Sequence, residues 1–86
     1  MAYSVGYKRS VRRDLKKLSK PDATRILDRI ENELVKNPES NPALKGPFSG
    51  LRKYRVGDYR IIYSLAGTQI LILKVGHRKG IYKRDV

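Results

Sequence analysis

With 86 residues, the chain is long enough for one small domain, residues 1–86, whose core can stabilise it by only about 3–5 kcal/mol. The absence of cysteine excludes disulfides and thiolate metal sites, and one histidine cannot hold a metal ion by itself, so the sequence predicts neither metal nor cofactor. Twenty Lys and Arg against eight Asp and Glu give a formal net charge of +12, which predicts a polyanionic partner, either a nucleic acid or an acidic protein.

The amino-terminal segment predicts a strand followed by a basic helix. It has no apolar run of signal-peptide length, and no segment reaches the roughly 18 apolar residues of a membrane span, so we expect a cytoplasmic protein. Tyr3, Val5 and Tyr7 alternate with small residues, which indicates a first strand of about five residues. From Ser10 to Leu18, apolar residues recur at helical spacing while Arg and Lys crowd the other side, which predicts a short basic helix.

A second helix is predicted from about Ser19 to the Asn37–Pro38 pair. Ser19 can cap it, a proline tolerates its first turn, and Asp22 has the capping-box spacing. An apolar stripe recurs along this segment at helical spacing and comprises Ala23, Ile26, Leu27, Ile30 and Leu34. Most acidic residues lie between Asp22 and Glu39, so the remaining surface is more strongly positive than the net charge suggests.

The following connector and the stretch after it predict the sheet. Residues 37–50 hold three of the four prolines, with Ala43, Leu44 and Phe48 as expected anchors to the core. The segment 51–75 contains three runs rich in Val, Ile, Leu and Tyr, divided by Val56-Gly57-Asp58 and Ala66-Gly67-Thr68. Such runs separated by glycine turns predict a three-stranded antiparallel meander.

The middle run of this meander has two different faces. Large apolar residues at 59, 61, 63 and 65 alternate with Arg60, Ile62 and Ser64, so one face is apolar and the other carries an arginine. After the meander, residues 76–80 form a basic turn, and residues 81–84 predict a short strand or an extended tail. The order is strand, helix, helix and three or four strands, which predicts a small α+β domain with both helices on one face of a mostly antiparallel sheet. The uncovered face, concave through its twist, would then carry the basic residues.

Three stretches of the chain are similar to a known family. They are Leu44–Gly46, Tyr54–Tyr63, and Val75–Arg78 followed by Tyr82. Together they resemble the RelE toxins of bacterial and archaeal toxin–antitoxin pairs over nearly the whole chain, and the V-G-D-Y-R motif is shared across the wider RelE/ParE superfamily. The resemblance implies a RelE-like fold, a toxin that cuts messenger RNA in the ribosomal A site, and a cognate RelB-like antitoxin that silences it.

The residues themselves suit RNA cleavage by attack of a ribose 2′-hydroxyl on the adjacent phosphate. That reaction needs a base, cations for the growing phosphorane charge, and an acid for the 5′-oxygen. Arg60 suits the phosphate because its planar fork offers two parallel donors from a rigid strand, and Arg78 in the next turn can close over the same phosphate. Lys53 shares the strand parity of Arg55, and nearby arginines favour loss of its proton, so we predict Lys53 as base and Arg55 as clamp.

The resemblance adds candidates near the end of the chain. It implies functional basic residues on the strand of Lys53 and Arg55, and a carboxy-terminal tyrosine that maps onto Tyr82. His77 also suits proton transfer. Because it points to the face opposite its neighbour Arg78, we rank it below Tyr82 as the acid. The predicted catalytic residues are Lys53, Arg60, Arg78 and Tyr82, and the predicted substrate-binding residues are Lys45, Arg55, His77 and Lys79.

Three functions remain open. One is a ribosome-dependent, metal-independent endoribonuclease, or mRNA interferase, which the basic residues at 53, 55, 60 and 78 together with Tyr82 favour. Another, by resemblance, is a ParE-like toxin that inhibits DNA gyrase without a nuclease site. The third is a basic RNA- or ribosome-binding module, for which we expect aromatic residues among the charges on an open sheet face. Independently of these functions, a structural alternative for Arg55 and Arg60 is that they are ordinary solvated strand residues.

Overall fold

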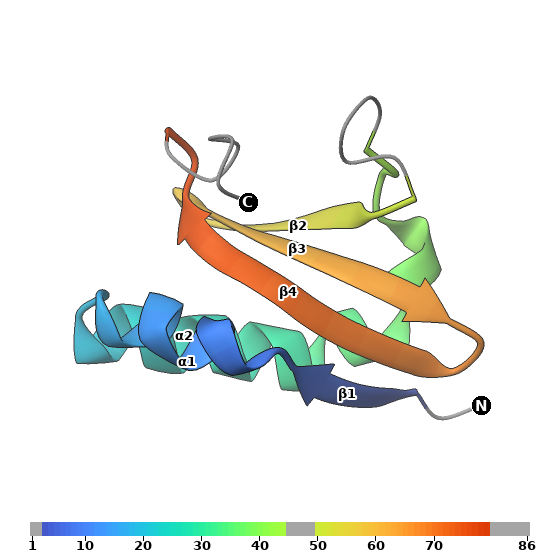
Figure 1. Cartoon of the computed structure of the whole chain (residues 1–86), viewed down its shortest axis with the longest axis horizontal. Coiled ribbons are helices and arrows are strands. Elements are labelled where there is room, and N and C mark those ends of the chain that lie inside the picture. Colours follow the sequence, from blue (N-terminus) through green and yellow to red (C-terminus); the bar gives the residue numbers. More distant parts are fainter. Residues whose placement is uncertain (1–2, 45–49, 80–86) are drawn as a thin grey trace.

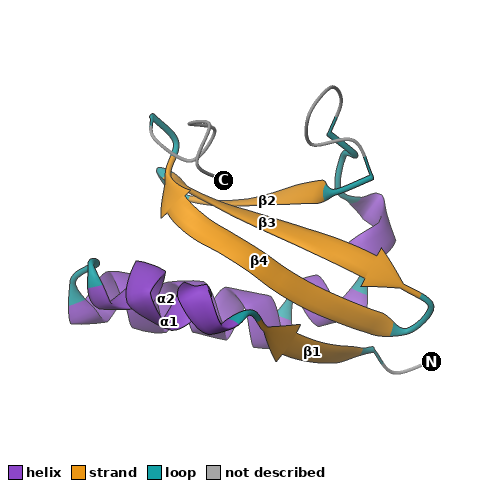
Figure 2. Ribbon diagram, viewed as in Figure 1, coloured by secondary structure: helices purple, strands orange, loops and turns teal. Residues whose placement is uncertain are grey.

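Two helices lie on one face of a four-stranded sheet in residues 3–44 and 50–79, which the computed structural model describes (Figures 1 and 2). The element order agrees with the α+β fold predicted from the sequence. The elements are β1 (Ser4–Tyr7), α1 (Arg9–Lys16), α2 (Lys20–Asn32), the single-turn 3-10 helices η1 (Leu34–Lys36) and η2 (Pro38–Ser40), β2 (Arg52–Val56), β3 (Tyr59–Ala66) and β4 (Gln69–His77). Among the described residues, no helix is long and apolar enough to cross a membrane.

The sheet has the strand order β1-β4-β3-β2. Strands β2, β3 and β4 form the predicted antiparallel meander, and β1 pairs in parallel with β4, from Ser4 opposite Gln69 to Tyr7 opposite Ile72. Gly57 and Gly67 open the two hairpin turns with φ angles of 59° and 61°. A glycine with positive φ at the first turn position is typical of type II′ turns, whose twist matches that of the flanking strands. The two glycine turns predicted from the sequence are therefore confirmed.

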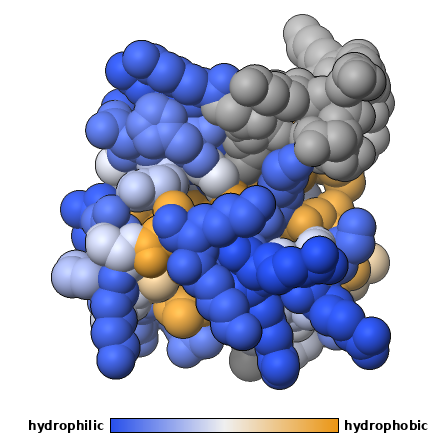
Figure 3. Space-filling model, turned by 60° about the vertical axis from the view of Figure 1, so that its left-hand side comes forward, coloured by the Kyte–Doolittle hydropathy of each residue, from blue (hydrophilic) through white to orange (hydrophobic). Residues whose placement is uncertain are grey.

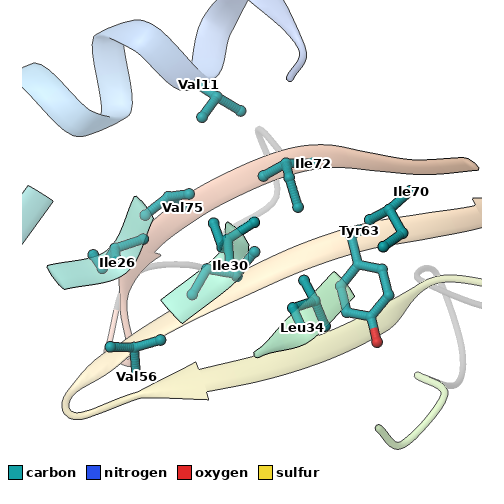
Figure 4. Close-up of a cluster of buried hydrophobic side chains, with 10 residues drawn as sticks. Val11, Ile26, Ile30, Leu34, Val56, Tyr63, Ile70, Ile72 and Val75 are labelled. Atoms are coloured by element: carbon teal, nitrogen blue, oxygen red, sulfur yellow. The ribbon is translucent and has the colours of Figure 1, made fainter. Parts of the chain in front are cut away.

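The core lies between α2 and the helix-facing side of the sheet (Figure 4). From α2 and η1, Ile26, Ile30 and Leu34 contribute the predicted apolar stripe, and each is at most 1% exposed. Full burial of such a side chain stabilises the fold by about 1.5–3 kcal/mol. The complete buried cluster comprises Val11, Ile26, Ile30, Leu34, Val56, Ile61, Tyr63, Ile70, Ile72 and Val75.

The second helix begins as predicted but ends earlier. The Asp22 backbone N–H donates to the Ser19 hydroxyl at 3.3 Å, which is the expected cap. The predicted end near Asn37 was wrong, because α2 stops at Asn32. There the Asn32 side chain donates to the carbonyl oxygen of Asp28 at 3.0 Å and to its carboxylate at 2.7 Å, a local alternative to helical bonding. The tighter η1 turn that follows still buries Leu34.

An aspartate joins α1 to the sheet. The pairing of β1 with β4 stops at Ile72, so the rest of β4 loses its neighbour on that side. Asp14 of α1 accepts a hydrogen bond there from the backbone N–H of Val75 at 3.1 Å. A carboxylate acceptor makes this bond stronger than one between neutral groups. The contact satisfies a strand-edge donor and turns the charge of Asp14 away from the outer side of α1.

Tyrosine hydroxyls hold most of the remaining carboxylates in the helical layer. The donor–acceptor pairs are Tyr3–Glu39 (2.7 Å), Tyr7–Glu31 (3.0 Å), Tyr54–Glu33 (3.5 Å) and Tyr59–Asp22 (3.1 Å). Burial, with a contribution from the Glu31 hydrogen bond, raises the pKa of Tyr7 well above its ordinary value. The hydrogen bond to Asp22 likewise raises the pKa of Tyr59. The carboxylates that accept these bonds all lie in α2 or in the residues just after it, so negative charge gathers along this part of the helical layer.

Candidate nucleic-acid interface

Cations line the face of the sheet that is turned away from the helices. Ile61 and Tyr63 belong to the core beneath α2, so alternation along β3 places Arg60 and Ile62 on the opposite face. Cross-strand partners share a face, and the register therefore adds their neighbours in β2 and β4. The two rows are Lys53–Ile62–Lys74 and Arg55–Arg60–Gly76. We call these six residues the outer face; neither row contains a carboxylate.

The centre of the outer face is more enclosed than an open sheet. Ile62 is 0% exposed although it lies outside the cluster beneath the helices. Lys53 and Arg60 beside it are half-buried, whereas Arg55 is exposed. Charges partly removed from water interact more strongly with an anion than fully solvated ones. The face thus combines an apolar centre at Ile62 with a lysine on each side and two arginines in the next row.

Lys74 is a member of the outer face that sequence reasoning missed. Tyr63 pairs with Ile72 whereas Ile62 pairs with Lys74, so β4 carries one extra residue, Leu73, in a bulge. Strict alternation would have placed Lys74 on the core side together with Ile72. The bulge moves Lys74 to the outer face, opposite Ile62. The only sign of this shift in the sequence is a lysine at a position that regular alternation would assign to the core.

Arg60 is the one strand residue of the outer face with a buried, unsatisfied donor among the described residues. Its Nη1 atom is buried and lacks a hydrogen-bond partner there. Arg55, directly opposite, instead donates from Nε to the carbonyl oxygen of Gly57 at 3.2 Å. Two arginines facing each other destabilise the sheet, and an uncompensated buried charge adds to that cost. An anion bound between them would relieve both effects.

Arg78 lies at the end of the sheet where β2 turns into β3. Its backbone N–H donates to the carbonyl oxygen of Asp58 at 2.9 Å. The Nε atom is 3.9 Å from the Asp58 carboxylate, and the arginine side chain is 52% exposed. An exposed pair of this length contributes little stability and leaves the guanidinium available. Arg78 follows Gly76, which pairs with Arg60, by two residues.

The structure does not bring His77 together with Arg60. His77 pairs with Tyr59, and the two rings meet edge to face with centroids 5.9 Å apart. The Tyr59 hydroxyl bonds to Asp22 of α2, which places this pair on the helix-facing side. Lys79 lies exposed in the next turn, where its backbone N–H donates to Nδ1 of His77 at 3.2 Å.

Two other predicted residues, Lys45 and Tyr82, lie outside the described residues. The outer face therefore unites Lys53, Arg55 and Arg60 from the predicted set, with Arg78 at its end. Within the part of the chain that the structure describes, no group of three or more His, Cys, Asp or Glu residues is arranged to hold a metal ion.

The chain matches known toxins over most of its length. Residues 5–82 match the family model described as the ParE toxin of type II toxin-antitoxin system, parDE. Toxin RelG from Mycobacterium tuberculosis (strain ATCC 25618 / H37Rv) is 31% identical over 87 residues, which cover 98% of this chain and 100% of RelG.

Solved structures of two toxin–antitoxin complexes share the fold. The RelBE2 complex from Mycobacterium tuberculosis matches with a TM-score of 0.85 and 28% identity, over 91% of this chain and 100% of that chain. The archaeal RelE–RelB complex from Pyrococcus horikoshii OT3 matches with a TM-score of 0.67 and 34% identity, over 93% of this chain and 99% of that chain. The chain therefore belongs to the RelE/ParE superfamily of toxins from type II toxin–antitoxin systems.

Proposed function

We propose that this toxin is a metal-independent endoribonuclease that cleaves messenger RNA in the ribosomal A site. The observation that carries the proposal is the buried Nη1 atom of Arg60, a charged donor without a partner among the described residues, on a face whose strand positions hold four cations and no carboxylate. A phosphodiester supplies the missing acceptors and the missing negative charge. The similarity of this chain to RelG and to the archaeal RelE also supports a toxin of the RelE type.

The outer face suits attack by a ribose 2′-hydroxyl. Lys53, as the base, takes the hydroxyl proton, and the resulting oxygen bonds to the adjacent phosphorus. The bond from phosphorus to the 5′-oxygen then breaks, and that oxygen receives a proton from an acid, for which Tyr82 is our candidate by resemblance. Arg60 stabilises the charge that grows on the non-bridging oxygens, while Arg55 and Arg78 hold the flanking backbone.

Ribosome dependence follows from the modest strength of these groups. The proposed base is a lysine, and most of the rate must therefore come from alignment of the 2′-hydroxyl with the phosphorus and the 5′-oxygen. Correct alignment alone can contribute about 7–11 kcal/mol. We propose that the ribosome imposes this geometry on the message, so that free RNA is a poor substrate. Lys45 and Lys79 are further proposed backbone contacts, and His77 is left out of the reaction because it lies on the other face.

We also propose a RelB-like antitoxin as the cognate partner. The solved relatives RelBE2 and RelE–RelB are toxin–antitoxin complexes. A partner with an acidic or amphipathic segment would complement the net charge of +12 and cover apolar surface of a small core. Binding over the outer face would block access of RNA to Arg60.

The second candidate function is inhibition of DNA gyrase. It is favoured by one specific observation, which is that the matching family model is that of ParE toxins. In that case toxicity would not require Arg60 as a catalytic residue, and no cleavage of RNA would accompany growth arrest.

The test compares Arg60→Ala with Arg25→Ala, a control that also removes one arginine but on α2. Purified proteins are incubated with ribosomes programmed with a defined message, and cut sites are mapped by primer extension. Losing one preorganised donor lowers such rates by about 10²–10³, so we expect that loss for Arg60→Ala and wild-type cleavage for Arg25→Ala. Wild-type cleavage by Arg60→Ala would refute the site. Absence of cleavage by the wild type, together with inhibition of purified gyrase, would favour the second candidate.

A further inference from the structure

Helix α1 carries a second cationic surface, on the opposite side of the sheet from Arg60. In Figure 1 both helices lie on one side of the sheet, whereas the outer face is turned away from them. Every third or fourth residue of α1 falls on one side of the helix, and the buried Val11 marks the opposite side. The exposed side, which we call the α1 surface, comprises Arg9, Arg12, Arg13, Lys16 and Lys17. Figure 3 shows hydrophilic side chains covering most of the face at the α1–α2 end of the molecule.

These charges act on α1 in two ways: Arg13 and Lys16 in the last turn suit the helix dipole, whereas the first turn and the like-charge pairs oppose the helix. Its first turn holds no acidic residue and its N-cap makes no side-chain hydrogen bond, so cations sit near the positive end of the helix dipole. Arg9 and Arg13, and likewise Arg12 and Lys16, repel each other across one helical turn. In residues 3–44 and 50–79, no member of the α1 surface has an ion pair. The one carboxylate of α1, on Asp14, is bound to the Val75 N–H.

The chemistry of the α1 surface fits the phosphate backbone of double-stranded RNA. Its exposed members are all cationic, whereas surfaces that bind single strands add aromatic side chains on which bases stack. Duplex RNA is recognised mainly by its shape and by contacts to phosphates and 2′-hydroxyls. The eight residues of α1 extend about 12 Å along the helix axis, enough to reach more than one phosphate of a strand.

We infer that the α1 surface is an anchoring site for duplex RNA, separate from the face that cleaves. The inference deepens the proposed function, on which it rests. A nucleotide held at Arg60 does not itself contact α1, because the two surfaces lie on opposite sides of the sheet. The α1 surface would therefore bind folded RNA, such as the ribosome contains, while the outer face binds the single-stranded message. Its members are positioning residues: they act on affinity and leave the reacting atoms alone.

The test measures binding of a fluorescent RNA duplex of about 16 base pairs by anisotropy, at several KCl concentrations. The variant Arg13→Gln with Lys16→Gln is compared with a charge-matched control, Arg25→Gln with Lys36→Gln, both on exposed positions outside the two surfaces. Each lost phosphate contact reduces the slope of log affinity against log salt by about 1. We expect the α1 variant to lose about 2 units of slope and the control to keep the wild-type slope. Glutamine has a helix propensity close to that of Arg and Lys, and circular dichroism checks the fold.

Further arms separate the alternatives. Arg60→Ala should lose ribosome-dependent cleavage and keep duplex binding, so that failure of the cleavage site is distinguishable from failure of the anchor. The α1 variant should cut free single-stranded RNA at the low wild-type rate and show a raised KM on ribosomes. Equal loss of duplex binding in the control variant, or none in the α1 variant, would overturn the anchor. Equally tight, α1-dependent binding of a polyglutamate peptide would also overturn it, in favour of an acidic protein partner.

Discussion

Arg60 illustrates how one side chain can oppose stability and support function. Its Nη1 atom is buried without a partner among the described residues, and Arg55 faces it across the strand pair. Both features raise the free energy of the unliganded fold, and both favour a bound phosphate. Preorganised charge of this kind is useful in catalysis because no reorganisation is needed when negative charge develops.

The first consequence at this scale is that Arg60→Leu should stabilise the protein while abolishing cleavage. Removing the like-charge pair alone is worth about 0.2–1 kcal/mol, and the free energy of unfolding should rise by at least that amount. For a domain of this size, 1 kcal/mol corresponds to about 4–8 °C in Tm. Thermal unfolding followed by circular dichroism measures the change. Ser64→Leu, on the same strand parity, controls for added apolar area, and a lower Tm for Arg60→Leu alone would contradict the argument.

Tyr7 predicts how stability depends on alkaline pH. Burial and the Glu31 hydrogen bond raise the pKa of Tyr7 in the folded state, while the unfolded chain titrates near the ordinary value of about 10. The folded state thus binds more protons above that pH, so this stabilisation is complete below about pH 10 and is lost as the pH rises further. Urea unfolding between pH 8 and about pH 11 should show the decline. Tyr7→Phe should reduce its slope, and an unchanged slope would show that Tyr7 is not responsible.

At the scale of elements, Asp14 predicts how α1 is held. The hydrogen bond that Asp14 accepts from Val75 closes the β4 edge just beyond its pairing with β1. Asp14→Ala leaves a strand donor without an acceptor, and we expect a loss of about 1–3 kcal/mol in the free energy of unfolding. Asp28→Ala is the control, because Asp28 is exposed and, among the described residues, its side chain bonds to Asn32 of its own helix. Urea midpoints and hydrogen exchange at the Val75 amide measure the effect; equal losses for both variants would exclude this role.

Local sequence signals predicted most of the fold. The hairpin glycines Gly57 and Gly67, the Ser19 cap and the stripe through Ile26 and Ile30 depend on neighbours in the chain, and each is found where expected. The parallel partner of β1 is different, because that pairing joins segments more than sixty residues apart. No local pattern specifies it.

The candidate site divides in the same way. Simple alternation in β2 and β3 placed Lys53, Arg55 and Arg60 on one face. It failed in β4, where the Leu73 bulge changes the parity and brings in Lys74.

The end of α2 was also missed, because Asn32 bonds back to Asp28 in a way that helical periodicity does not reveal. Positions set by hydrogen bonds between elements, or by one inserted residue, need the structure.

At the scale of the whole molecule, self-repulsion predicts a salt response. The extents of the molecule are 33 × 29 × 22 Å and its net charge is +12. The Debye length is about 30 Å at 0.01 M salt and about 8 Å at 0.15 M, so salt screens repulsion between opposite sides of the protein. We therefore expect Tm to rise by several degrees from 0.01 to 0.15 M KCl. The variant Arg13→Gln with Lys16→Gln should show a smaller rise, and a fall in Tm with salt would show that attractive pairs dominate instead.

The bulge at Leu73 also determines which face of the sheet each later residue of β4 occupies. Before Leu73, Ile70 and Ile72 face the helices, and after it Val75 and His77 do, with Lys74 and Gly76 turned outward. A β4 of the same length that paired in regular alternation, without the bulge, would exchange these two sets after Ile72. It would direct an ammonium group into the apolar interior and a valine toward the solvent. Deletion of Leu73, by contrast, would leave Ile72, Lys74 and Val75 in regular alternation and keep Lys74 on the outer face, because the inserted residue and the bulge would be lost together.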